Sequence, residues 1–135
     1  MLKVTCALIV ENQKLLITQN SSNSDHPFQW EFPGGKMKPG EDAEHCILRE
    51  IKEELNIVVS VVRRLEPVGF DYGFKRIELI PFLCRIQSGT IQLHEHIDFE
   101  WIGFKKIKET DFSGADRELI LETRNAGILK KYVGE

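Results

Sequence analysis

Three glutamates within one short segment are the residues of this chain best suited to chemistry. Glu50, Glu53 and Glu54 stand at positions i, i+3 and i+4, so a helix would project all three from one narrow stripe. Like charges at this spacing destabilise a helix unless a cation lies among them. Clustered carboxylate oxygens suit Mg²⁺ or Mn²⁺, ions that bind phosphate oxygens and activate water. The stripe therefore predicts metal-dependent chemistry on a phosphorylated substrate.

The alternative interpretation of this stripe is the solvated acidic face of an ordinary helix, because charge runs usually face water. The surrounding residues favour a functional site. An apolar stripe with helical spacing lies opposite the glutamates and predicts a helix packed on a core. Arg49 precedes Glu53 by four residues and is expected to pair with it, while Asp42 and Glu44 favour the start of the helix. The apolar stripe comprises Ala43, Ile47, Leu48, Ile51 and Leu55.

The same segment resembles the signature box of the Nudix hydrolases, G-x5-E-x7-R-E-U-x-E-E-x-G-U, where U is a bulky aliphatic residue. One position departs from this pattern, because Asn56 stands where the box has its last glycine. That glycine ends the helix with a positive backbone angle, and Asn is the next most tolerant residue, so we expect the turn to form. The matching positions are Gly35, Glu41, Arg49, Glu50, Ile51, Glu53, Glu54 and Ile57.

The resemblance implies an α/β fold, an α/β/α sandwich around a central mixed β-sheet. It implies one Nudix domain over residues 1–135, with the box at 35–57, and hydrolysis of a nucleoside diphosphate linked to another group. Glu41 is expected to support the site and Arg49 to hold a glutamate in place. The catalytic base is either Glu53 or Glu50, because this role varies within the family. The implied metal ligands are Glu50, Glu53, Glu54 and the carbonyl of Gly34.

Residues outside the box resemble the MutT branch of the family, whose members hydrolyse nucleoside triphosphates to monophosphate and pyrophosphate. The loop WEFPGGK at 30–36 is similar to that of the branch, and LLITQ, LHEH and DFSGAD further along the chain also have counterparts there. By position, Glu95 is implied to help the metal site and Asp116 to contact the base. The implied substrate-binding residues are Glu31, Phe32, Gly35, Lys36 and Asp116.

The base that such an enzyme accepts stays open at this point. Asp116 stands where MutT has Asn, and an ionised Asp only accepts hydrogen bonds, which suits a guanine N1 and N2 edge or a cytosine amino group. Both 8-oxo-dGTP and CTP or modified dCTP are therefore candidate substrates, and Phe74 or Phe28 are candidate walls of the base pocket. The alternatives are hydrolysis of a nucleotide sugar or dinucleoside polyphosphate, and nucleotide binding without catalysis.

Other polar residues receive simpler interpretations. The paired arginines that MutT carries after its second strand are absent. His94 and His96 lack further Cys or His partners at zinc-ligand spacing, so we expect surface histidines. The three lysines at 105, 106 and 108 are expected in a solvated turn. The candidate phosphate contacts are Lys36, Lys75 and Arg76.

Length and composition predict a single soluble enzyme domain. The chain has 135 residues, enough for one core, and a net charge of −3, which argues against binding a nucleic-acid polymer. Its start lacks the pattern of a signal peptide and no apolar run could span a bilayer, so we expect a cytoplasmic protein without membrane contact. Three cysteines without paired spacing are expected as buried thiols. The expected cofactor is Mg²⁺ or Mn²⁺, the expected partner is a nucleoside triphosphate, and no pattern indicates an oligomeric state.

Hydrophobic patterning predicts the elements that must position these residues. A strand at 3–10 is apolar on both faces, as expected inside a covered sheet, and a turn leads to a second strand at 14–19. A polar loop is expected at 20–27, and a helix at 116–132 with Leu119, Ile120, Thr123, Ile128 and Leu129 inward. Pro81 removes a ladder donor, so its strand is expected to be exposed or bulged there. Further strands are expected within 57–72, 76–86, 90–93 and 99–102.

Overall fold

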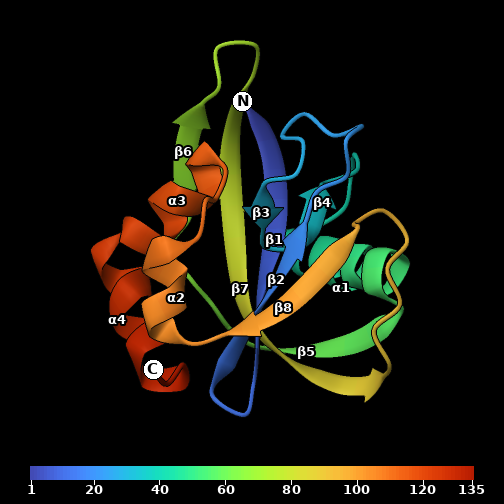
Figure 1. Cartoon of the computed structure of the whole chain (residues 1–135). Coiled ribbons are helices and arrows are strands. Elements are labelled where there is room, and N and C mark those ends of the chain that lie inside the picture. Colours follow the sequence, from blue (N-terminus) through green and yellow to red (C-terminus); the bar gives the residue numbers. More distant parts are fainter.

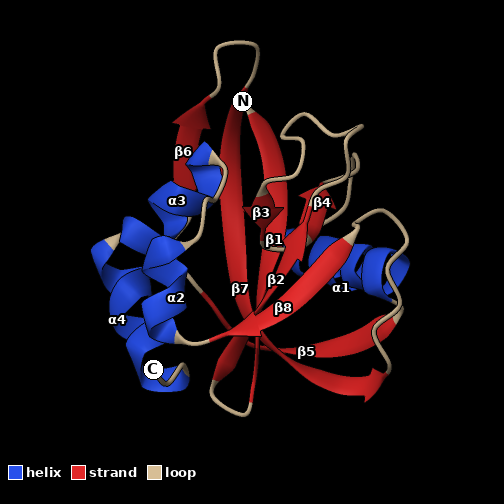
Figure 2. Ribbon diagram, viewed as in Figure 1, coloured by secondary structure: helices blue, strands red, loops and turns tan.

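A computed structural model describes residues 1–135 as a central sheet with helices on both sides (Figures 1 and 2). The strands are β1 (Leu2–Glu11), β2 (Lys14–Gln19), β3 (Trp30–Glu31), β4 (Gly34–Lys36), β5 (Ile57–Arg64), β6 (Val68–Asp71), β7 (Arg76–Gly89) and β8 (Asp98–Ile102). The helices are α1 (Ala43–Leu55), α2 (Phe104–Glu109), α3 (Gly114–Leu121) and α4 (Thr123–Tyr132). Helix α1 covers one face of the sheet and α2 to α4 cover the other, which confirms the predicted fold class.

The sheet is built around one parallel pair of strands. β1 and β7 run side by side from Leu2 opposite Ile77 to Ile9 opposite Cys84. The path of the sheet is β3-β2-β1-β7-β5, and β4, β6 and β8 pair with β1, β7 and β2. These other pairings are antiparallel, so the sheet is mixed. β1 is buried on both faces from residue 5 to residue 10, as its sequence predicts.

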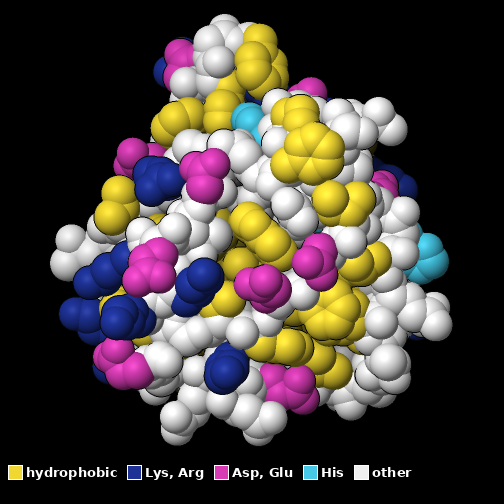
Figure 3. All heavy atoms as spheres, viewed as in Figure 1, with side chains coloured by type: hydrophobic (Ala, Val, Ile, Leu, Met, Phe, Trp, Pro, Cys, Tyr) yellow, Lys and Arg dark blue, Asp and Glu magenta, His cyan; other side chains and the backbone are white.

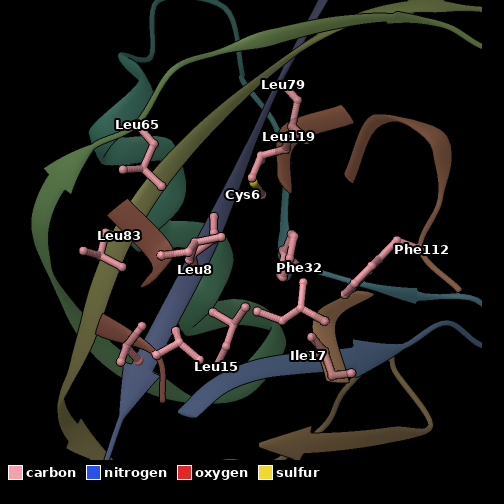
Figure 4. Close-up of a cluster of buried hydrophobic side chains, with 14 of the residues drawn as sticks. Cys6, Leu8, Leu15, Ile17, Phe32, Leu65, Leu79, Leu83, Phe112 and Leu119 are labelled. Atoms are coloured by element: carbon pink, nitrogen blue, oxygen red, sulfur yellow. The ribbon is translucent and has the colours of Figure 1, made fainter. Parts of the chain in front are cut away.

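Two hydrophobic clusters, one on each face, fix the helices. The larger cluster lies between the sheet and α2 to α4 and includes Leu8, Phe32 and Leu119 (Figure 4). The smaller one packs α1 against the sheet through residues such as Ile47 and Ile51, both fully buried. Burying a side chain of this size stabilises the fold by about 1.5–3 kcal/mol. The apolar stripe of α1 therefore faces the core, and the glutamate stripe is left on the other side.

Residues 90–93 form a loop, whereas the sequence analysis expects a strand there. The N–H of Gln92 donates to the carbonyl of Leu55 at 3.0 Å, and the N–H of His94 donates to the carbonyl of Glu54 at 3.2 Å. These carbonyls are among the unpaired groups at the end of α1. The N–H groups of this loop therefore bond to the carbonyls at the end of α1 and not to a neighbouring strand. The loop also brings residues 94–96 next to α1.

The expected helix at 116–132 is two helices. Glu122 breaks it with an extended conformation (φ −62°, ψ 128°), and its side chain caps α4 by accepting the N–H of Asn125 at 2.9 Å. Thr123 is exposed, not inward, because it starts a new helix. Pro81 lies where the partner of β7 changes from β6 to β5, and β5 carries a register shift close by, in line with the expected irregularity.

The side of the molecule that carries α2 to α4 bears charges of both signs. Lys105, Lys106 and Lys108 belong to helix α2, not to a turn, and all three are exposed as expected. Figure 3 shows Lys and Arg side chains interspersed with Asp and Glu over this side. None of the four helices has the length and hydropathy needed to cross a bilayer.

Candidate active site

The glutamate-bearing helix α1 is capped at both ends. Asp42 accepts the N–H of His45 at 2.8 Å and so satisfies one free donor of the first turn. Asn56 adopts a left-handed conformation (φ 59°, ψ 31°), and its N–H donates to the carbonyl of Lys52. The helix therefore ends as the sequence predicts, although Asn replaces the glycine of the box.

Arg49 joins three carboxylates beside the glycine loop. Its Nε and Nη2 donate to both oxygens of Glu41 at 2.7 and 2.9 Å, and its Nη1 donates to Glu50 at 3.0 Å and to Glu53 at 3.2 Å. The Glu53 contact is the i, i+4 pair expected from the sequence. Hydrogen bonds from Arg49 lower the pKa of Glu41 to about 2. We call Glu41, Glu50 and Glu53 the Arg49-paired carboxylates, since one guanidinium orients all of them.

Gly34 and Gly35 of β4 are packed too closely for side chains. A Cβ on Gly34 would collide with the backbone of Thr5, and a Cβ on Gly35 would collide with the carboxylate of Glu50. Gly34 and Gly35 lie opposite Cys6 and Thr5 in the antiparallel ladder between β4 and β1, and the Glu50 side chain of α1 packs onto Gly35. The glycines thus let the carboxylate of Glu50 lie directly against the loop backbone.

Glu54 differs from the Arg49-paired carboxylates because it has no cationic partner. It is only 5% exposed, and its Oε2 is buried without a hydrogen bond. Burial, together with the charges of Glu31, Glu50 and Glu95, raises the pKa of Glu54 to about 10. We call Glu31, Glu54 and Glu95 the cavity carboxylates, because all three line the same cavity. These acidic groups disfavour one another's ionised forms, and a cation bound among them would stabilise those forms.

Two adjoining cavities open at these carboxylates. The polar cavity has a volume of about 630 Å³ and no hydrophobic lining residue. The mixed cavity is smaller, about 190 Å³, and seven of its lining residues are hydrophobic. Five residues line both cavities, which makes the two spaces neighbours: His26, Glu31, Gly34, Lys36 and Lys75. A ligand with one ring and one highly charged part would match this pair of spaces.

Asp116 lies in the mixed cavity and is 5% exposed. Its Oδ2 accepts the N–H of Phe32 at 3.0 Å. Burial, and to a smaller extent the charge of Glu31, raises the pKa of Asp116 well above its usual range. The ionised, accept-only carboxylate assumed from the sequence is therefore corrected: the environment favours the protonated form, which can donate as well as accept a hydrogen bond.

The structure brings most of the sequence-predicted site residues to the two cavities. Those that line at least one cavity are Glu31, Phe32, Gly34, Gly35, Lys36, Glu54, Glu95, Lys75 and Asp116. Arg49, Glu50 and Glu53 lie on α1 next to the glycine loop and line neither cavity. Phe74 and Phe28 are 67% and 56% exposed and also lie outside both cavities, as does Arg76.

Several residues of the site are missed by the sequence analysis. His96 is expected at the surface, but it is buried between Glu31 and Glu54. His26 packs on Tyr72 with ring centroids 4.6 Å apart, and Asp25, which no sequence pattern singles out, binds the sequence-predicted Lys75 at 2.9 Å. These contacts join the 20–29 loop to the β6–β7 hairpin over the mixed cavity. They link distant segments, and no local sequence pattern encodes them.

The donor set of the site fits a hard divalent cation. The side chains are not gathered into a compact cluster of three or more acidic, histidine or cysteine ligands. Arg49 holds three box glutamates, Glu41, Glu50 and Glu53, and Glu54 Oε2 is left buried without a partner. Carboxylate and carbonyl oxygens are ligands that suit Mg²⁺ or Mn²⁺, and a cation would give the Glu54 oxygen a partner.

Comparison with known proteins assigns the class of protein. The family model described as "NUDIX domain" matches residues 1–122, so the chain belongs to the Nudix hydrolase family. Enzymes of this family generally use a divalent metal such as Mg²⁺ and act on nucleotides.

Individual relatives show which members of the family the chain resembles. The chain is 30% identical over 120 residues to the CTP pyrophosphohydrolase of Escherichia coli, covering 89% of each protein. It is 28% identical over 124 residues to the 8-oxo-dGTP diphosphatase of Buchnera aphidicola, covering 92% of this chain and 98% of that one. The solution structure of the E. coli ORF135 protein matches with a TM-score of 0.81 and 27% identity, covering 97% and 92%.

Proposed function

We propose that the protein is a Mg²⁺-dependent nucleoside triphosphate pyrophosphohydrolase that converts an oxidised or modified (d)NTP, such as 8-oxo-dGTP, to (d)NMP and pyrophosphate. The observation that carries this proposal is the pair of adjoining cavities. The polar cavity offers two lysines, Lys36 and Lys75, and the cavity carboxylates, which suits a triphosphate accompanied by a cation. The mixed cavity offers apolar walls and buried hydrogen-bonding groups, which suits a base.

The chain's own groups have distinct tasks in this mechanism. The residues that would hold the metal are Glu50, Glu53, Glu54, Glu95 and the carbonyl of Gly34. When bound there, Mg²⁺ would supply positive charge to offset that of the phosphates and would lower the pKa of a water that it binds. Glu53 or Glu50 accepts the proton of the attacking water, and Arg49 keeps both carboxylates oriented. Lys36 and Lys75 balance the charge of the phosphates.

The base is read by the walls of the mixed cavity. Glu31 lies at the junction of the two cavities, and Asp116 lies deep in the smaller one with one oxygen fixed by the Phe32 N–H. A protonated Asp116 can donate to an acceptor atom on the base edge and accept from the N–H group next to it. Guanine presents O6 beside N1–H, and cytosine presents N3 beside its amino group. The second candidate substrate is therefore CTP or a modified dCTP, supported by the similarity to an enzyme named CTP pyrophosphohydrolase.

Substrate profiling tests the proposal. The purified protein with Mg²⁺ would be offered 8-oxo-dGTP, dGTP, CTP, dCTP and 5-substituted dCTP, with ADP-ribose, a UDP-sugar and a dinucleoside tetraphosphate as comparison substrates. Release of pyrophosphate and monophosphate from a triphosphate, abolished by EDTA, is expected. Higher kcat/KM on a comparison substrate would overturn the triphosphate assignment. Tight nucleotide binding without pyrophosphate release would overturn catalysis altogether.

A further inference from the structure

His96 is a buried imidazole in the loop that closes the end of α1. Its side chain is only 4% exposed, although His94 and Glu95 next to it are exposed. The loop is held against α1 by the bond from the His94 N–H to the Glu54 carbonyl. The backbone that delivers His96 is thus fixed to the same helix turn that carries the Glu54 side chain.

The imidazole lies between two cavity carboxylates from different elements. Its Nε2 is 2.8 Å from Oε2 of Glu31 on β3, which is a hydrogen bond, and its Nδ1 is 3.7 Å from Oε2 of Glu54 on α1. Glu31 lines both the polar and the mixed cavity, whereas Glu54 lines only the polar one. His96 therefore connects the residue at the cavity junction with the buried carboxylate of the box.

Two atoms at this point are unusual. Nδ1 of His96 and Oε2 of Glu54 are both buried without a hydrogen-bond partner. Buried polar atoms of this kind are costly, and a folded protein retains few of them. One ring nitrogen of His96 bonds to Glu31, and the other lies beside the unpartnered oxygen of Glu54. At this place the arrangement of the carboxylates matters more than local stability.

We propose that His96 is a positioning residue that fixes Glu31 by hydrogen bonding and keeps Glu54 in place on the other side of the ring. The two carboxylates then present their remaining oxygens to the cavities in one fixed arrangement. The inference rests on the proposed function, because it takes Glu54 as a metal ligand and Glu31 as a substrate contact. The inference adds that His96 links these two carboxylates. Residues that contact metal ligands, but not the metal, commonly orient those ligands in the same way.

The test compares His96→Leu, His96→Gln and the wild type. Mn²⁺ affinity of the nucleotide-free protein is measured by electron paramagnetic resonance, and KM and kcat are measured on the best triphosphate. We expect His96→Leu to weaken Mn²⁺ binding about 10- to 100-fold, and to raise KM. His96→Gln keeps a donor for Glu31, so it is expected to recover most of both losses. Leu129→Ala is the matched control, since it removes a buried side chain of α4 on the far face of the sheet.

The outcomes separate positioning from simple packing. A general loss of stability would lower the melting temperature of His96→Leu and Leu129→Ala alike and leave Mn²⁺ affinity unchanged in both. Folded His96→Leu with wild-type Mn²⁺ affinity and wild-type KM overturns the proposal. If His96→Leu does not fold, His96→Ala, which also lacks a donor for Glu31, replaces it, and wild-type Mn²⁺ affinity in that variant overturns the proposal equally. If no triphosphate is hydrolysed by the wild type, the proposed function fails, whereas the Mn²⁺ measurement still decides the role of His96.

Discussion

The Arg49-paired carboxylates and the cavity carboxylates are two sets of three glutamates within one site, but their surroundings differ. Glu41, Glu50 and Glu53 share one guanidinium that contacts each at 3.2 Å or less. Glu31, Glu54 and Glu95 have no arginine or lysine in contact, and the pKa of Glu54 is raised to about 10. The difference teaches that Arg49 orients one set and offsets part of its charge, whereas the other set has no cationic side chain of the chain in contact and depends on a cation from outside.

Replacing Glu53 by Gln is expected to have the largest effect. The amide keeps the size of the side chain and can still contact Arg49, but it cannot accept a proton or bind a metal as a carboxylate does. We expect kcat to fall about 10²- to 10⁴-fold, with an unchanged melting temperature. The steady-state rate of pyrophosphate release at saturating Mg²⁺ measures kcat. Full turnover in this variant would remove Glu53 from the mechanism and leave Glu50 as the base.

Gly35→Ala is expected to have the next largest effect. The new Cβ would collide with the Glu50 carboxylate and push it off the loop and away from Arg49. A displacement of about 1 Å in a catalytic group can reduce turnover about 100-fold. Gly127→Ala is the matched control, because a Cβ there has nothing within 4 Å. Comparable kcat values for the two alanine variants would show that the position of Glu50 is unimportant.

Arg49→Lys tests how the guanidinium holds the Arg49-paired carboxylates. Lysine keeps the charge but cannot bind both oxygens of Glu41 while also reaching Glu50 and Glu53. We expect kcat/KM to fall about tenfold, the equivalent of about 1.4 kcal/mol. The Mg²⁺ concentration dependence of the rate is measured alongside it. An unaltered rate at every Mg²⁺ concentration would argue that the charge alone matters, without the geometry of the guanidinium.

The matched pair Glu54→Gln and Glu41→Gln should change stability in opposite directions when metal is absent. The folded pKa of Glu54, about 10, exceeds its ordinary value of 4.5, so its contribution to stability is full below pH 4.5 and is lost as pH rises toward 10. The folded pKa of Glu41, about 2, lies below 4.5, so its contribution is present above pH 4.5 and is lost as pH falls toward 2.

At pH 8 to 9 in EDTA, Glu54→Gln is therefore expected to melt a few degrees above the wild type, the equivalent of about 1 kcal/mol. Glu41→Gln is expected to melt below it. Added Mn²⁺ should raise the melting temperature of the wild type more than that of Glu54→Gln, because a ligand stabilises the state that binds it. Melting shifts of the same sign in both variants would contradict the proposed difference between the two sets.

Local features of the site are predictable from sequence, and long-range ones are not. The caps of α1, its buried stripe and the Arg49–Glu53 pair depend on residues within one helix and its flanks, so spacing alone predicts them. The burial of His96 depends on a loop that bonds to the far end of α1, and the packing of His26 on Tyr72 joins segments far apart in the sequence. Neither leaves a periodic pattern in the sequence.

The protonation state of Asp116 also depends on long-range packing. The residue type suggests an ionised acceptor, but protonation depends on burial, which only the packed structure provides. The aromatic side chains illustrate the reverse case. Phe74 and Phe28 have the right type for a base pocket, but their backbone carries them to exposed positions. Residue type narrows the candidates, and tertiary packing selects among them.

The parallel pairing of β1 with β7 also has a consequence for how the chain folds. β1 can pair with β2 and β4 early, but its pairing with β7 requires that α1, β5 and β6 have been synthesised first, since Leu2 pairs with Ile77. At roughly 5–20 residues per second, the edge of β1 that faces β7 stays unpaired for several seconds during synthesis. Contacts between such distant segments also slow folding. This exposed edge raises the risk of aggregation during synthesis, and a chaperone that covers the first strand would reduce that risk.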